Sequence, residues 1–326
     1  MGTTFHGLHS LRGLAAVAVL LFHAKAVFGT QLAPSGYLAV DLFFILSGFV
    51  IAHSYDPRFE AGLSPRTFIL ARAARFWPLF ALGTAFGAAW LALENIVAPP
   101  AALSIAEVIG FSVLALAYVP APAAGDLFPL NVPAWSLFFE LIVNAGFALF
   151  FSLSKTRWLL GVVAMSAVAL AIILAFDLFD VQTWGGVRAI YGFSLGVLLY
   201  RSRWSPAQMP EWFVIAVVCA TFALPEGKLV EAACVFLVYP LAIATLAFAG
   251  GGASSRLPKI LGDLSFPLYA LHYPILQAAL GVSGQLALPA WLIGLAAVAG
   301  CFVTAWLGEV LIDRPIRRAL KPGTPQ

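Results

Sequence analysis

Long apolar runs follow one another along almost the whole chain, and few charged residues separate them. Hydrophobic residues make up 62% of the sequence and charged residues only 10%, whereas a soluble domain carries about a quarter charged residues. A chain with this balance cannot cover itself with a polar surface. The sequence therefore predicts an integral membrane protein of the all-α class, a polytopic bundle of transmembrane helices.

Ten of these runs approach the roughly 17–25 residues that a membrane-spanning helix needs. They cover residues 9–28, 37–55, 76–95, 133–153, 157–176, 186–200, 211–226, 230–250, 265–283 and 288–311. We expect one membrane domain over residues 1–326.

Basic residues gather after every second run, and the loops between these clusters are nearly free of Lys and Arg. The cluster Arg58–Arg75 follows the second run, for example, and the loop Gly29–Ser35 precedes it. Because positive loops stay in the cytoplasm, this alternation places both termini there. The net charge of +3 is small, so the pattern indicates topology and not nucleic-acid binding.

The apolar segment Ile105–Val119 does not fit the alternation, because a span there would invert every later loop. Prolines precede and follow it. We expect a re-entrant or surface-lying segment that lines a cavity, since irregular backbone at membrane depth needs protein or water around it. The alternative is an eleventh span.

Arg12 and His23 lie eleven residues apart in the first run. Eleven residues are close to three helical turns, so both side chains share one face and His23 lies near mid-membrane. An ionisable group at that depth is a candidate functional residue. The alternative is a histidine bonded to a neighbouring helix. Glu309, near the end of the last run, is a candidate ion-pair partner for Arg12.

Polar side chains also recur at helical spacing in two later runs. Such stripes on apolar helices predict polar groups that face the bundle interior. The residues are Ser136, Glu140 and Asn144 in the fourth run, and Ser265, Tyr269 and His272 in the ninth. Glu140 either orients a catalytic histidine or holds helices together. His272 either contacts substrate or bonds across helices.

Two further features have a structural and a functional interpretation. Asp41, near the start of the second run, either pairs with another helix or takes part in the chemistry. Ser47-Gly48 after it is typical of close helix packing. Arg72 and Arg75 are ordinary cytoplasmic arginines, or form a clamp for phosphate. The cysteines and histidines show no metal-binding spacing, so we expect no metal site.

The chain resembles the acyltransferase 3 family of integral membrane acyltransferases in blocks that follow the family's order. These blocks are HSLRGLAAVAVLLFH (9–23), GYLAVDLFFILSGFVI (36–51), RAAR (72–75), VPAWSLFFE (132–140), LGDLSFPLYALH (261–272) and DRPIRR (313–318). The resemblance matches the family's Arg-x10-His pair to Arg12 and His23, and its Arg-x-x-Arg pair to Arg72 and Arg75. Many relatives have an acidic residue just before the LRG, where this chain has His9.

The resemblance implies a ten-helix O-acyltransferase of the bacterial cytoplasmic membrane with no bound cofactor. It implies acyl-coenzyme A, with acetyl as the expected acyl group, as the cytoplasmic donor and a carbohydrate such as exopolysaccharide or O-antigen as the acceptor. We expect Arg72 and Arg75 to hold the donor's phosphates, and His23, oriented by Glu140 or Asp41, to take a proton from the acceptor hydroxyl. Arg12 is expected to fix the first helix or to bind the donor through its charge. A covalent acyl-histidine is a variant of this mechanism. The competing class is a transporter or flippase without acyl transfer.

Overall fold

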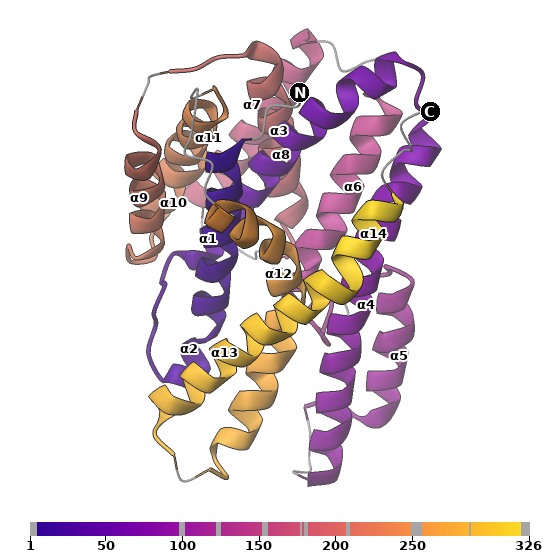
Figure 1. Ribbon diagram of the computed structural model, residues 1–326, viewed down its shortest axis with the longest axis vertical. Coiled ribbons are helices and arrows are strands. Elements are labelled where there is room, and N and C mark those ends of the chain that lie inside the picture. Colours follow the sequence, from indigo (N-terminus) through magenta and orange to yellow (C-terminus); the bar gives the residue numbers. More distant parts are fainter. Residues whose placement is uncertain are drawn as a thin grey trace. The chain divides into compact units, whose positions relative to one another are not determined.

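The computed structural model describes residues 5–97, 102–121, 125–151, 156–176, 178, 182–206, 209–248, 256–286 and 288–320, and all regular structure in these ranges is helical (Figure 1). The α-helices are α1 (His6–His23), α2 (Lys25–Phe28), α3 (Ala39–Glu60), α4 (Pro65–Val97), α5 (Ile105–Leu116), α6 (Trp135–Leu149), α7 (Thr156–Ala175), α8 (Gly185–Ser202), α9 (Glu211–Phe222), α10 (Lys228–Ala233), α11 (Tyr239–Phe248), α12 (Arg256–Ser283), α13 (Ala290–Gly308) and α14 (Arg314–Ala319). Two short 3₁₀ helices, η1 (Gly36–Leu38) and η3 (Val132–Ala134), lead into α3 and α6. Two π-helical segments, η5 (Cys234–Val238) and η6 (Glu309–Asp313), continue α10 and α13. The prediction of an all-α chain is confirmed for these residues.

Within the described ranges, six helical stretches are long and apolar enough to cross a membrane. They are Gly36–Glu60, Pro65–Val97, Val132–Leu149, Arg157–Ala175, Lys228–Ala247 and Ala290–Ala319, and each coincides with one predicted run. The other four runs form α1, α8, α9 and α12. Helix α9 has only 12 residues, and the other three carry ionisable side chains along their length. The ends of the predicted runs 133–153 and 230–250 lie outside the described residues. Ten crossings and cytoplasmic termini therefore stay predictions.

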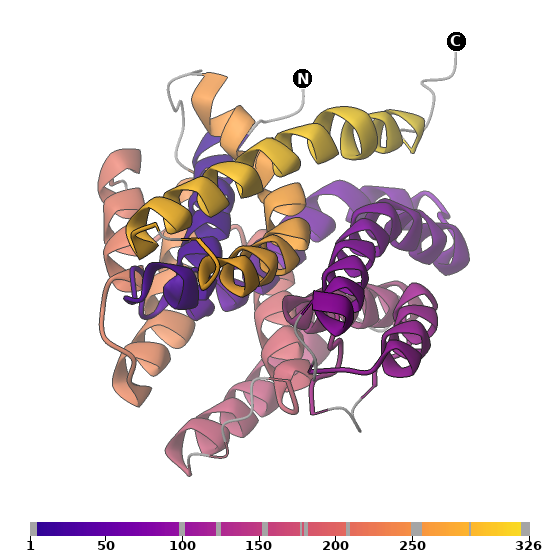
Figure 2. The same cartoon turned by 90° about the horizontal axis from the view of Figure 1, so that it is seen from below.

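The segment predicted to be re-entrant or surface-lying contains α5, which Ser104 and Glu107 start with a reciprocal capping box. Twelve residues rise about 18 Å, which is short of the ~30 Å hydrocarbon core. Figures 1 and 2 show α5 alongside α4, and the Trp77 indole donates a 2.9 Å hydrogen bond to the Leu116 carbonyl. Phe111, Ala115 and Val119 of the segment also line a small pocket. The choice between a cavity-lining segment and an eleventh span stays a prediction.

The packing divides the chain into two compact units that alternate along the sequence. The first unit comprises Met1–Phe22, Ala33–Ile69 and Phe139–Ser265, and the second comprises His23–Leu32, Leu70–Phe138 and Phe266–Gln326. Because the borders fall inside α1, α4, α6 and α12, these helices contribute to both units.

The core of the first unit is the close pairing of α3 with α8. A Cβ added at Gly48 of α3 would overlap the carbonyl oxygen of Phe193, and one added at Gly196 of α8 would overlap that of Ile45. Glycine at both positions lets the two backbones approach closely, as small residues do at membrane helix interfaces. The prediction of tight packing at Ser47-Gly48 is thus confirmed.

The second unit packs α4 against α12 and the π-helical end of α13. Leu79, Ala270 and Leu271 are completely buried, with Phe266 and Ile312 packed around them.

A proline in α12 adds a polar link to this packing. Pro274 has no backbone N–H, so the carbonyl of Ala270 one turn earlier lacks its helical donor. The Asn131 side-chain amide supplies one, at 2.9 Å. This bond ties the segment before α6 to the middle of α12.

We predict that Gly48→Ala destabilises the protein, because the added methyl group meets backbone and not a movable side chain. Overpacking of this kind costs about 1–3 kcal/mol. The apparent melting temperature in detergent should therefore fall by several degrees. The matched control is Gly161→Ala on exposed α7, where an added Cβ meets nothing within 4 Å. Alanine there should leave the melting temperature unchanged or raise it. Equal melting temperatures for both variants would contradict the proposed contact.

Candidate active site

Two histidine rings from opposite ends of the sequence meet in the second unit. His23 is the last residue of α1 and His272 lies in α12. Nε2 of His272 is 3.1 Å from Nδ1 of His23, and the ring centroids are 5.1 Å apart. His272 is 1% exposed, whereas His23 is only partly buried. One interpretation of His272 was a bond to a neighbouring helix, and this contact between α12 and α1 is confirmed. His23 is less buried than His272 and keeps some access to its surroundings.

Tyr269 anchors the same helix one turn before His272. Its hydroxyl donates to the Pro133 carbonyl at 3.0 Å and lies 2.5 Å from the hydroxyl of Ser136. The ring of Tyr273 stands edge-on to His23, with centroids 5.4 Å apart. Two members of the predicted stripes, Ser136 and Tyr269, thus come together beside the histidine pair.

The third residue of the α12 stripe, Ser265, makes a local bond. Its hydroxyl donates to the Gly262 carbonyl at 2.7 Å, and a guanidinium nitrogen of Arg12 donates to the same oxygen at 2.5 Å. Arg12 therefore fastens α1 to the first part of α12 within the first unit. Glu309 accepts a hydrogen bond from Arg317, and its predicted pair with Arg12 stays a prediction.

Glu140 and Asn144 form a polar contact inside the first unit. The Glu140 carboxylate accepts hydrogen bonds from the hydroxyl of Ser47 on α3 and from the Asn144 amide, the latter at 2.9 Å. Glu140 is 8% exposed and Asn144 is fully buried. This contact joins α6 to α3, as the helix-packing interpretation of Glu140 predicts.

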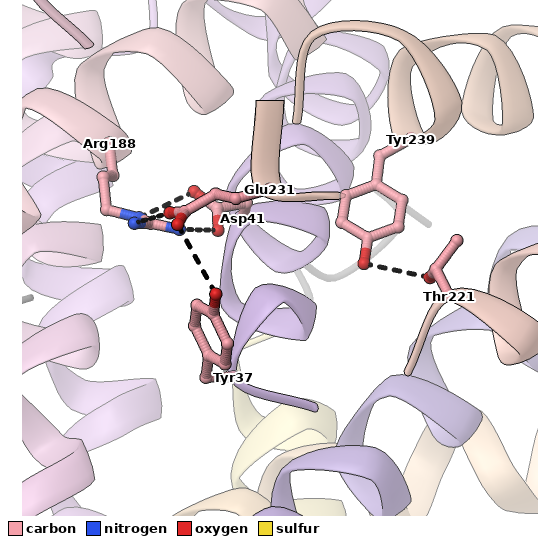
Figure 3. Close-up of polar contacts among 6 residues, drawn as sticks. All are labelled: Tyr37, Asp41, Arg188, Thr221, Glu231 and Tyr239. Carbon is pink, nitrogen blue, oxygen red and sulfur yellow. Dashed lines mark hydrogen bonds and ion pairs between the residues drawn. The ribbon is translucent and has the colours of Figure 1, made fainter. Parts of the chain in front are cut away.

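Asp41 belongs to a buried cluster of charges in the first unit (Figure 3). The Arg188 guanidinium donates to both oxygens of Asp41, with its Nε 3.0 Å from Oδ1, and a further nitrogen donates to Glu231 at 2.5 Å. The hydroxyl of Tyr37 donates to Glu231 at 3.4 Å. Arg188 is 3% exposed and Asp41 is 2% exposed. The cluster joins α3, α8 and α10, so the pairing interpretation of Asp41 is confirmed.

Arg188 and Glu231 were not predicted as site residues, although the sequence carries a signal for them. Asp41, Arg188 and Glu231 each lie within the first few residues of a predicted run that follows a loop poor in Lys and Arg. Three ionisable residues of both signs, each at the outer end of its predicted span, are expected at similar depth. Opposite charges at one depth in an apolar bundle are candidates for pairing.

Arg72 and Arg75 lie three residues apart on α4, as predicted for one helical face. Both side chains are partly buried. The Arg72 guanidinium lies 4.6 Å from the centroid of the Phe76 ring. Planar guanidinium groups at this spacing are able to bind phosphate oxygens in a bidentate manner.

The two units thus differ in chemical capacity. The first holds its buried arginine against two carboxylates, which neutralise it. The second presents a partly buried imidazole with a second imidazole at one nitrogen, and imidazole is the side chain that most often serves as a general acid or base. No group of His, Cys, Asp and Glu suited to a metal ion occurs in the described residues.

Comparison with known proteins identifies the family. The model of the acyltransferase 3 family, described as an acyltransferase domain, matches residues 5–310. The exopolysaccharide production protein ExoZ of Rhizobium meliloti (strain 1021) is 30% identical over 92% of this chain and 95% of its own length. Protein 2 in the picA locus of Rhizobium radiobacter is 38% identical over 52% of this chain and 93% of its own length. No solved structure matches. The chain therefore belongs to the acyltransferase 3 family and is an integral membrane acyltransferase.

Proposed function

We propose that the protein moves an acyl group, most simply acetyl, from cytoplasmic acyl-coenzyme A to a hydroxyl of a cell-surface or exported polysaccharide. The observation that carries the proposal is the likeness to ExoZ, a protein named for exopolysaccharide production, over 92% of the chain. The bacterial sources of both relatives support a place in the bacterial cytoplasmic membrane. Membership of an acyltransferase family argues against a transporter or flippase that transfers no acyl group.

The donor site in this proposal is the pair Arg72 and Arg75. Coenzyme A carries phosphates, and arginine binds phosphate through two parallel N–H donors. Both arginines lie near the start of α4, within the basic cluster that the loop pattern assigns to the cytoplasm. Leu79, one turn after Arg75, packs against Leu271, the neighbour of His272. The same packed cluster of the second unit therefore supports the proposed donor site and the histidine pair.

The proposed reaction uses His23 as a general base. Its neutral imidazole takes the proton of the acceptor hydroxyl while the hydroxyl oxygen attacks the thioester carbonyl. The carbon–oxygen bond forms, the carbon–sulfur bond breaks, and the leaving thiolate takes the proton from the imidazolium. The products are an ester on the glycan and free coenzyme A. Holding donor and acceptor together supplies a further part of the rate.

The other candidate residues take supporting roles. Asp41 and Glu140, expected to orient His23, have partners within the first unit, and we propose that they fix its helices. We propose that Arg12 positions α1 through the carbonyl of Gly262. Within the second unit, the polar side chains of Ser136, Tyr269 and His272 are proposed to line the interior around the reaction. Asn144 and Ser265 are bonded inside the first unit, and we propose that they hold its helices.

Purified protein should transfer label from acetyl-coenzyme A to polysaccharide taken from a strain that lacks this gene. His23→Ala should reduce turnover by ~10²–10⁴-fold, because the general base is lost. The control is His53→Ala, which removes a histidine of the first unit that packs edge-on against Phe5 and Tyr200. That variant should keep near-wild-type turnover. Turnover by a folded His23→Ala protein at the wild-type rate would exclude the proposed base.

Arg75→Ala should raise the Michaelis constant for acyl-coenzyme A about tenfold or more, since each charge-assisted hydrogen bond contributes roughly 1.5–3 kcal/mol. Arg75→Lys should restore it only in part, because lysine lacks the planar fork. The Michaelis constant for the acceptor should change little. Arg66→Ala, an exposed arginine of the same cluster, is the control and should leave donor dependence unchanged. If the Michaelis constant for acyl-coenzyme A is also unchanged in both Arg75 variants, the arginines act only as topology signals.

The donor side depends on the orientation of the chain in the membrane. We predict that a cysteine at Ala61, in a background without Cys219, Cys234 and Cys301, is labelled by an impermeant maleimide only from the cytoplasmic side. A cysteine at Thr30 should be labelled from the outside. Both positions are exposed. The opposite labelling pattern would invert the topology and rule out a cytoplasmic donor site at α4.

A further inference from the structure

The surroundings of His272 decide which of its ring nitrogens carries hydrogen. Nδ1 lies 2.8 Å from the carbonyl oxygen of Tyr269 and 3.1 Å from that of Leu268. Carbonyl oxygens only accept hydrogen bonds, so Nδ1 must be the donor. An unprotonated Nδ1 would direct its lone pair at two carbonyl oxygens. In a neutral imidazole the second nitrogen, Nε2, then has no hydrogen and presents a lone pair.

The contact between the two rings then determines which nitrogen of His23 carries hydrogen. Nε2 of His272 accepts, so Nδ1 of His23, 3.1 Å away, is the donor. The proton of a neutral His23 is therefore on Nδ1, and its Nε2 keeps a lone pair. The partner that a histidine has at one nitrogen sets the state of the other nitrogen, as in other sites built around histidine.

We propose that His272 is a positioning residue that fixes the tautomer and ring orientation of His23, so that Nε2 of His23 is the atom that accepts the proton from the acceptor hydroxyl. This inference rests on the proposed function of His23 as general base. The proton moves from the hydroxyl to Nε2 of His23 and then to the thiolate of coenzyme A. Nδ1 of His23 keeps its hydrogen throughout and donates to His272, so no proton moves between the rings.

The fold holds His272 rigidly enough for this role. Its ring is 1% exposed and hydrogen-bonded to its own helix. The carbonyl of Ala270, freed by Pro274, is held by Asn131, and the hydroxyl of Tyr269 is held by the carbonyl of Pro133. These contacts fix the helical turn that precedes the ring. A supporting partner that orients a reactive ring must itself be locked by its surroundings.

The experiment compares two substitutions of the same residue. In His272→Gln the amide oxygen can lie where Nε2 was and accept from Nδ1 of His23, whereas His272→Leu offers no acceptor. The glutamine variant should keep turnover within about tenfold of wild type. The leucine variant should lose ~10²-fold or more in kcat, as expected when a general base is in the wrong tautomer, with little change in the Michaelis constant for acyl-coenzyme A. His53→Leu is the matched control and should behave as wild type.

A spectroscopic measurement separates this proposal from the function on which it rests. The chain has five histidines, so ¹⁵N-histidine labelling of protein in nanodiscs gives few imidazole signals. Those of His23 are the signals lost in His23→Ala. We expect wild-type His23 with hydrogen on Nδ1, and a mixture of tautomers in His272→Leu. A wild-type His23 with hydrogen on Nε2 overturns the proposal whatever the activity.

The activity assay and the spectra together distinguish failure of the positioning role of His272 from failure of the general-base function of His23. Equal losses of turnover in the glutamine and leucine variants, both folded by thermal unfolding, would also overturn the positioning role. If the wild-type tautomer is as inferred but His23→Ala keeps full turnover, the general-base function fails while the tautomer assignment stands. Should the leucine variant fail to fold, the glutamine variant and the wild-type spectrum still decide.

Discussion

A polar group that this chain buries among apolar helices needs a partner within the protein, because hydrocarbon offers none. Arg188 shows the consequence most clearly, since its guanidinium is bound by Asp41 and Glu231 from two other helices. Removing one partner of a buried ion pair costs about 3–5 kcal/mol, because the remaining charge stays buried without compensation. The cluster therefore restricts how α3, α8 and α10 can pack, and the glycines of α3 and α8 provide the close approach that it needs.

The same constraint explains the structure around the prolines of α12. A proline in a helix leaves a carbonyl without its donor, and in an apolar bundle that carbonyl needs another one. Asn131 donates to the carbonyl of Ala270, and the backbone carbonyl of Pro133 is bound by Tyr269. Side chains and backbone thus bind each other reciprocally across two segments of the second unit. His272 lies between Tyr269 and Pro274, so it is held by bonds that the helix needs in any case.

Acyl transfer by the proposed route needs a base that is neutral before the reaction and charged only during it. The two units differ in the polar groups that they bury. The first keeps its full charges paired and buried, at Arg188 and Asp41. The second places the buried ring of His272 against the partly exposed ring of His23. Hydrophobic packing at Leu79 and Leu271 connects the helix of His272 to the helix that carries Arg72 and Arg75.

The sequence by itself determined the membrane class, the helical fold, the family, and the polar stripes that contain Tyr269 and His272. These features are local, because apolar length and helical periodicity can be read along one segment. Only the tertiary structure decided the partners: His272 binds His23, 249 residues away, and Asp41 binds Arg188, 147 residues away. Several polar groups were predicted at similar depth, so helical spacing could not choose among them. The packing of the helices determines which groups pair, since a hydrogen bond requires its two atoms to lie within about 3 Å of each other.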